Sequence, residues 1–325
     1  MIAILVIALA AGSASALMFA SIVSGELISL LLIYLAPLPL MVAALGWGPL
    51  AATIGGITAA LALGVIFDLP LCISFAVTVA LPAWWLGHLA LLGRPVAAGP
   101  LSGNGVAAVA PVLEWYPVGR ILLWIAGFAV LTMMAALLTL GSDAEAITGT
   151  MRRGLLRFFG PRDTATGDDI ERLVDAFVVI APAAAASAAM IRLMLNLWLG
   201  AKIAATSGRL HRPWPDLKTI ALPQMTLVAL SVALGFCFIG GLSAMFAQIV
   251  AAALMMAYAI TGFAVLHTLT LALKSRALWL GCAYATCVVT LPWAVLAVAV
   301  LGLADAVFGF RQRFLRRRPP PLPAS

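Results

Sequence analysis

Apolar stretches of about 20 residues recur along the chain, separated by short polar or proline-containing segments. An α-helix of that length crosses the hydrocarbon core of a bilayer, which is roughly 30 Å thick. The pattern predicts spans at residues 2–23, 27–46, 48–67, 70–92, 119–141, 174–201, 219–240, 242–272 and 277–304. Because Pro37 and Pro39 interrupt the second stretch, we expect eight or nine spans. Such long continuous runs argue against a transmembrane β-barrel, whose strands alternate over about ten residues.

Composition supports the same class of protein. Of the 325 residues, 64% are hydrophobic and 10% are charged, and the mean hydropathy is +1.13. A soluble domain cannot remove that much apolar surface from water, so lipid must be the solvent for most of it. We expect an all-α, polytopic transmembrane helix bundle with a single domain at 1–310. A basic, proline-rich and disordered tail follows at 311–325.

Two connecting segments carry different predictions. The segment from Arg94 to Gly119 is rich in Gly, Pro and Ala, which is typical of an irregular linker. Residues 142–173 contain "DAEAITGTMRRGLLRFF", where the spacing puts one row of apolar side chains on a single helical face: Ile147, Met151, Leu155 and Phe158. Arginines flank that face, so we expect a short amphipathic helix in the headgroup region. A solvated loop is the alternative.

The net charge of +7 is carried mainly by loops and the tail. In a membrane protein such residues set orientation and contact anionic lipid, and no basic stretch is interleaved with aromatics as nucleic-acid binding would favour. With nine spans, eight basic residues fall on one side and ten on the other, so the positive-inside rule does not decide the orientation. We place the tail in the cytoplasm, because it is the densest basic cluster, and the protein in the inner (plasma) membrane of the cell.

Small residues recur every four positions in two predicted spans. The first span contains Ala8, Gly12, Ala16 and Ala20, and the third contains Gly48, Ala52, Gly56, Ala60 and Gly64. A neighbouring row in the third span holds Ala51, Gly55 and Ala59. Helices associate in lipid where small residues let their backbones approach. We therefore expect two tightly packed faces, either within the chain or against a partner membrane subunit.

Polar residues inside predicted spans are candidate sites, because burying them in lipid is costly. Arg192 and Asn196 are four residues apart and share a helix face. Arg192 lies ten residues before Lys202, or roughly 15 Å at helical rise. It either binds a solute together with Asn196, pairs structurally, or extends its side chain to the headgroups. Asp68, at the end of the third span, is a further candidate if the bundle brings it to Arg192.

The sequence gives no positive indication of catalysis or metal binding. The chain contains no Gly-rich phosphate loop with Lys, no His-Glu-x-x-His and no Gly-x-Ser-x-Gly. His267 stands alone in an apolar stretch, without metal-site spacing to the other two histidines, and is expected to be a packing residue. We predict that the protein is not an enzyme and holds no metal or cofactor, and an intramembrane hydrolase is a remote alternative.

Four segments carry a family resemblance: "PLPLMVAALGWGPLAATIGGITAAL", "MIRLMLNLWLGAKIA", "ITGFAVLHTL" and "GLADAVFGFRQRF". The chain resembles the YybS-like family of bacterial multi-pass membrane proteins, a domain of unknown function. Its first third is also similar to the substrate-binding subunits of energy-coupling-factor vitamin transporters. The family often has Gln-Gly where this chain has Thr261-Gly262, which weakens any role for that position. The resemblance implies a membrane protein related to solute-binding subunits and supplies no substrate.

Two functions remain open from the sequence. The first is a solute-binding or transport-related protein without its own ATPase, which would hold a small molecule among its helices and use a small-residue face for a partner subunit. The alternative is a membrane scaffold or assembly factor, in which the polar residues only lock helices together. A polar space beside Arg192 at mid-membrane favours the first function, and solid packing there favours the second.

Overall fold

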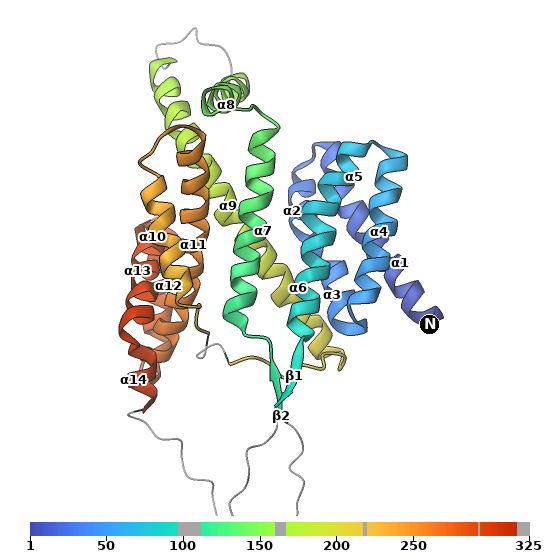
Figure 1. Cartoon of the computed structure of the whole chain (residues 1–325), viewed down its shortest axis with the longest axis vertical. Coiled ribbons are helices and arrows are strands. Elements are labelled where there is room, and N and C mark those ends of the chain that lie inside the picture. Colours follow the sequence, from blue (N-terminus) through green and yellow to red (C-terminus); the bar gives the residue numbers. More distant parts are fainter. Residues whose placement is uncertain (97–111, 160–166, 217–219, 292, 317–325) are drawn as a thin grey trace, which may run out of the picture. The chain divides into compact units, whose positions relative to one another are not determined.

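The computed structural model describes residues 1–96, 112–159, 167–216, 220–291 and 293–316, and most of these are helical (Figure 1). Within them, seven helices are long and apolar enough to cross a membrane, or eight if α13 (Trp293–Phe308) and α14 (Phe310–Arg316) form one bent span. The predicted all-α, polytopic helix bundle is confirmed. Its seven spans fall one short of the expected eight or nine, and the count reaches eight only if the bent pair is one span.

The chain forms two compact units. Unit 1 comprises Met1–Ile125 and Ile191–Pro215, and unit 2 comprises Ala126–Met190 and Asp216–Ser325. Two boundaries fall inside continuous helices, α7 (Val118–Leu138) and α9 (Gly167–Thr206), so both helices contribute to both units. The apolar pattern predicted one domain. It does not indicate the division, because these two boundaries interrupt no apolar stretch.

Unit 1 begins with eight helical segments: α1 (Ile2–Ala20), η1 (Ser21–Ser24), α2 (Leu27–Leu35), α3 (Pro37–Trp47), α4 (Pro49–Ile66), α5 (Leu69–Phe75), the π-helix η2 (Ala76–Ala80) and α6 (Leu81–Leu91). Four of them carry a proline in the first turn, where a missing backbone N–H costs nothing. The prolines thus divide the second expected span into α2 and α3. The fourth contains a π-helical turn just before Pro82.

A β-hairpin follows α6. Strands β1 (Gly93–Val96) and β2 (Val112–Trp115) pair antiparallel, with Gly93 opposite Trp115. Arg94 and Glu114 face each other and form an ion pair of 2.7 Å. The irregular linker expected here is therefore wrong at both ends, where paired strands and a cross-strand charge pair add order. Residues 97–111 between them lie outside the described residues.

Helices α1 and α4 pack backbone to backbone in unit 1. A Cβ built on Gly12 would overlap the Gly55 carbonyl, and one built on Gly55 would overlap the Ala8 carbonyl. Ala51 and Ala59, one turn either side of Gly55, are buried as well. The row of α4 that meets α1 is thus the neighbouring row of small residues. The α1 face is occupied by α4 of the same chain.

The other row of α4 has different neighbours. A Cβ on Gly56 would lie 3.1 Å from the Ala80 Cβ, and one on Gly64 would lie 3.2 Å from the Cys72 Cβ. Gly48 does not belong to this packed face, contrary to the prediction. Its φ is +93° at the junction of α3 and α4, and no atom lies within 4 Å of where its Cβ would be. Glycine is needed there for the backbone turn.

Unit 2 holds the second part of α7, the first part of α9, and seven further segments: α8 (Ala144–Phe159), α10 (Met225–Phe236), α11 (Gly241–Leu269), η4 (Thr270–Ala272), α12 (Arg276–Val289), α13 and α14. The expected span at 277–304 is wrong as a single helix, because Thr290 ends α12 and a new helix starts at Trp293. The expected span at 219–240 contains only the 12 residues of α10 in helical form.

The closest contact in unit 2 joins α11 and α13. A Cβ on Gly262 would overlap the Val298 carbonyl, and one on Gly302 would overlap the Tyr258 carbonyl. Gly262, which agrees with the Gln-Gly pair of the family although Thr261 does not, thus has a packing role. The arrangement repeats the glycine contact of α1 with α4.

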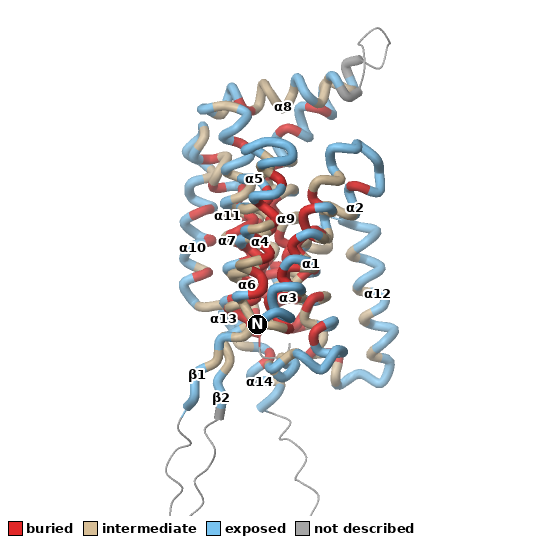
Figure 2. The backbone as a smooth tube through the Cα atoms, turned by 90° about the vertical axis from the view of Figure 1, so that its right-hand side faces the viewer, coloured by how far each residue is buried: buried red, intermediate tan, exposed pale blue. Residues whose placement is uncertain are grey.

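Helix α8 lies crosswise to α10 of the same unit (Figure 2). It falls within the segment expected to be amphipathic. Its Ile147 is fully buried in a cluster with Leu137, Ala186 and Ile249, and Met151 packs against them. Part of the apolar face therefore rests on protein, while an interfacial position for the helix stays a prediction. The Phe158 side chain lies outside the described residues.

The chain bends by 64° between α13 and α14. Gly309 provides the positive φ of the bend. The Asp305 carboxylate accepts hydrogen bonds from the Arg311 backbone N–H, at 2.9 Å, and from its Nε, at 2.7 Å. The tail expected to be disordered from residue 311 therefore begins as a fixed helix. Residues 317–325 lie outside the described residues.

Candidate functional site

The candidate site lies on the part of α9 that belongs to unit 1. Arg192, Asn196, Gly200 and Ile203 follow one another at spacings of four, four and three residues, so they share a face. At Gly200 this face touches α3, since a Cβ there would lie 3.3 Å from the Met41 Cβ. The close approach fixes the two polar side chains among the helices of unit 1.

The Arg192 side chain points toward the middle of a neighbouring span. Its Nη2 donates to the Thr78 carbonyl at 3.4 Å, and Thr78 lies in η2, near the centre of the candidate span Leu69–Leu91. Pro82, four residues after Thr78, has no N–H to offer that carbonyl, and Arg192 gives it a side-chain donor. This direction does not match a side chain that reaches for the headgroups.

The positive charge of Arg192 has no counter-ion. No Asp or Glu oxygen lies within 4.0 Å of its guanidinium among the residues that the structure describes. Its Nε is buried and has no hydrogen-bond partner. An arginine at the centre of a membrane span costs about 2.5–3.5 kcal/mol on insertion scales, so an unpaired one needs a reason.

Asn196 lies one turn further along α9 and is 1% exposed. Its Nδ2 donates to the carbonyls of Tyr34 and Arg192, both at 2.8 Å. Tyr34 is in the last turn of α2, immediately before the break at Pro37. The Asn196 Oδ1 is buried without a partner. The side chain thus supports an interrupted helix and still leaves one acceptor unfilled.

Together the two side chains offer an unpaired cation and a free acceptor one helical turn apart. A guanidinium presents a fork of donors that matches carboxylate or phosphate, and an amide oxygen accepts from N–H or O–H. A small anionic molecule that also carries a hydrogen-bond donor would satisfy both. The bonds from Arg192 to Thr78 and from Asn196 to Tyr34 also hold α9 against η2 and α2. The two residues therefore have a structural role as well.

Asp68 is not part of this cluster. Its Oδ1 accepts a hydrogen bond of 2.7 Å from the Leu71 N–H, which makes it the N-cap of α5. Its side chain is exposed, and no ion pair joins it to Arg192 in the described part of the chain. The hypothesis that Asp68 binds solute is replaced by a capping role, which an Asp before a Leu-Pro helix start favours.

Cations at the end of α9 form a second feature, which the sequence analysis did not single out. Lys202 lies 4.4 Å from the Trp214 ring, and Arg209 lies 4.6 Å from the Trp47 ring. Trp beside Lys or Arg at a span end is typical of the membrane interface, and that signal was present in the sequence. The level of Lys202 therefore puts Arg192, ten residues away, roughly 15 Å deep.

Arg212 completes this end of unit 1. Its Nη1 donates to the Ala90 carbonyl and its Nη2 to the Tyr116 carbonyl, both at 3.0 Å. Burial lowers the pKa of Arg212 from its ordinary value, although an arginine stays charged at any working pH. The two bonds fasten the segment after α9 to the two ends of the hairpin.

In unit 2, His267 bonds the Tyr284 hydroxyl through Nε2 at 2.7 Å, and Phe263 stacks on the same tyrosine. This is the environment of a packing histidine. No group of three His, Cys, Asp or Glu side chains that could hold a metal ion occurs among the described residues.

The family model described as "Predicted membrane protein (DUF2232)" matches residues 13–306 of the chain. No curated protein matches it, and no solved structure does. The match extends over most of both units and includes Arg192, Asn196 and Asp68.

Proposed function

This chain belongs to that family of membrane proteins, and we propose that it binds a small anionic solute within the bilayer as a transport-related subunit without its own ATPase. The observation that carries the proposal is the charge of Arg192, which is directed into unit 1 and has no acidic partner among the described residues. A buried charge is tolerated when an opposite charge neutralises it. A bound anion would supply that charge.

The neighbouring groups favour a particular kind of anion. The free Oδ1 of Asn196 can accept a hydrogen bond from a donor group, and the guanidinium of Arg192 can donate to a carboxylate or phosphate. An amino acid, or a hydroxy acid, carries both kinds of group. The proposal assigns no catalytic step to the site. It places the protein in the bacterial inner membrane, and its likeness to substrate-binding transporter subunits is part of the same proposal.

Any motor subunit must use a surface other than the two small-residue faces, since these are occupied within the chain. Helix α12 is a suitable surface, because none of its residues is buried. Figure 2 shows it pale blue along most of its length. A partner helix that covers α12 would join unit 2 and leave the polar cluster of unit 1 free for solute.

The test is retention of small molecules by full-length protein purified in lipid nanodiscs. Bound molecules are identified by mass spectrometry after release, and candidate carboxylates and phosphates are then ranked by thermal stabilisation. We expect Arg192→Gln to lose the retained anion, Arg192→Lys to retain it weakly, and Asn196→Ala to fall between. Arg94→Gln, which removes an exposed arginine of the hairpin, is the matched control. Identical retained molecules in wild type and Arg192→Gln would contradict the proposal.

A membrane scaffold or assembly factor is the second candidate. It is favoured by the bonds from Arg192 and Asn196 to the Thr78 and Tyr34 carbonyls, which tie α9 to two interrupted helices. In that case Arg192→Gln should lower the melting temperature without changing any bound small molecule. The same set of variants therefore separates the two functions.

A further inference from the structure

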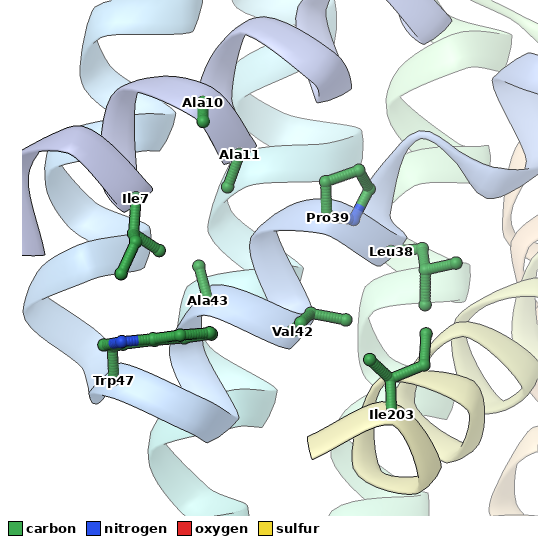
Figure 3. Close-up of a pocket in the computed structure, with 9 residues that line it drawn as sticks. All are labelled: Ile7, Ala10, Ala11, Leu38, Pro39, Val42, Ala43, Trp47 and Ile203. Carbon is green, nitrogen blue, oxygen red and sulfur yellow. The ribbon is translucent and has the colours of Figure 1, made fainter. Parts of the chain in front are cut away.

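A groove of about 420 Å³ lies between α1, α3 and α9 in unit 1. Its lining is apolar, with Ile7 and Trp47 at one end and Leu38 and Ile203 at the other (Figure 3). Alanines of α1, among them Ala10, leave the hollow between these larger side chains. The volume is within the roughly 300–1,000 Å³ typical of ligand pockets.

The groove is at membrane depth, because its three helices are all candidate spans. An empty hollow would forfeit dispersion contacts for every side chain that lines it. With no polar group to hold water, hydrocarbon is the natural filling. These properties suit an acyl chain, and the apolar lining does not favour a polar solute. The groove therefore differs from the Arg192–Asn196 cluster in the kind of ligand it can bind.

Positive charge lies at the Trp47 end of the groove, and a second cation adjoins a lining residue in the sequence of α9. The Arg209 guanidinium lies 4.6 Å from the centre of the same Trp47 ring that lines the groove. Lys202 directly precedes the lining residue Ile203. Neither cation has a carboxylate within ion-pair distance in the described part of the chain. The groove thus combines an apolar channel with unneutralised cations at the level of the headgroups.

From this combination we propose that the groove is a specific site for one anionic phospholipid, whose acyl chain lies against α1, α3 and α9 and whose phosphate contacts Lys202 and Arg209. This goes beyond the proposed solute binding and does not depend on it. A free phosphate would use the cations and leave the groove empty. An anionic lipid matches both features at once.

The experiment counts lipids bound to the full-length, delipidated protein by native mass spectrometry, with phosphatidylglycerol and phosphatidylcholine of identical acyl chains as probes. Wild type should bind one phosphatidylglycerol in preference to phosphatidylcholine. Removing each cation should weaken that binding about fivefold, and Lys202→Gln with Arg209→Gln about 25-fold. Ala10→Leu, which fills the groove, should abolish the specific binding of both lipids.

Two controls are matched to these changes. Arg153→Gln with Arg157→Gln removes the same net charge from α8 and should leave the binding intact. Ala62→Leu adds the same bulk to an exposed position of α4 and should do the same. Equal loss in both charge pairs would mean non-specific attraction and would overturn the proposal. So would equal binding of the two lipids, competition by inorganic phosphate alone, or a dimer that Ala10→Leu dissociates.

Discussion

Each unit holds an arginine among its helices, Arg311 buried and Arg192 partly buried, and the difference between the two is the clearest functional signal in the molecule. In unit 2, Arg311 is paired with Asp305 at 2.7 Å, and their side chains are 10% and 6% exposed. In unit 1, Arg192 has a long bond to a backbone carbonyl and no acidic partner among the residues that the structure describes. A paired charge fixes a bend and needs nothing more. An unpaired one is stable only if something else brings the negative charge.

The units agree in their packing, which makes the contrast in charge more informative. Gly12 and Gly55 bring α1 and α4 together, as Gly262 and Gly302 bring α11 and α13 together. Both units therefore rely on small residues and close backbones, as expected in lipid. What distinguishes unit 1 is that α9 sends polar side chains to two interrupted helices, at η2 and at the end of α2.

The largest effect is expected from breaking the pair in unit 2. Asp305→Ala leaves Arg311 buried without its carboxylate and should destabilise the protein by about 3–5 kcal/mol. Replacing both residues by leucine should recover most of that loss, because two buried charges disappear together. Arg192→Gln, by contrast, should cost little when no anion is bound. Unfolding in detergent, followed by circular dichroism, measures all three.

If Arg192→Gln were as damaging as Asp305→Ala, the contrast between the units would fail. Arg192 would then have a structural partner, and the scaffold function would be favoured.

The sequence predicted the parts of this picture that depend on local pattern. Spacing placed Arg192 and Asn196 on one face and marked small-residue faces in the first and third spans, because helical periodicity is regular. It did not predict which row of α4 meets α1, since both rows are equally small. It also missed the pair of Asp305 with Arg311, six residues apart across a bend that only the positive φ of Gly309 creates.

Two residues predicted to contact distant parts of the chain act within their own segment. Asp68 caps its own helix, and Gly48 makes a turn. The broken span at 277–304 was missed because its residues are apolar on both sides of the break. Apolar composition reports burial in lipid and says little about where a helix ends.

The second prediction tests whether the two glycine contacts are equivalent. Gly12→Ala and Gly302→Ala each place a methyl group on a backbone carbonyl, and each should cost about 2–3 kcal/mol. Gly127→Ala and Gly281→Ala are matched controls, because their Cβ positions have no atom within 4 Å. These controls should gain up to about 1 kcal/mol from helix propensity. Equal melting temperatures for all four variants would remove the packing argument.

The third prediction concerns the support that α9 gives to the broken helix of unit 1. Asn196→Ala removes the donor to the Tyr34 carbonyl and should cost about 1–2 kcal/mol. Ser187→Ala on the same helix removes a hydroxyl bonded to its own helix at Ala183, and it should have little effect. Hydrogen exchange should rise at α2 and α3 in the first variant. Exchange that rises uniformly over unit 2 as well would contradict a local role.

The smallest effect is expected at α8, where unit 2 holds charges at its surface. Arg152 bonds Asp175 at 2.7 Å and Glu171 at 3.1 Å, and the hydrogen bond to Asp175 is the main reason why the pKa of Arg152 is raised above its ordinary value. A group whose pKa is higher in the folded state stabilises that state at pH values below its unfolded-state pKa. This contribution is lost as the pH rises through its folded-state pKa. For arginine this window lies above any working pH, so substitution and salt must test the contact.

Arg152→Gln should therefore lower the melting temperature by much less than Gly302→Ala, and high salt should erase the difference from wild type. Arg153→Gln, whose arginine bonds only Thr150 on its own helix among the described residues, is the control with equal charge change. Ile147→Ala should cost more than either, because Ile147 is fully buried against α7, α9 and α11. If Arg152→Gln lowered stability more than Ile147→Ala, the ion pairs of Arg152 would be the main contacts that hold α8 in place. The apolar face of α8 would then be free to enter the headgroup region.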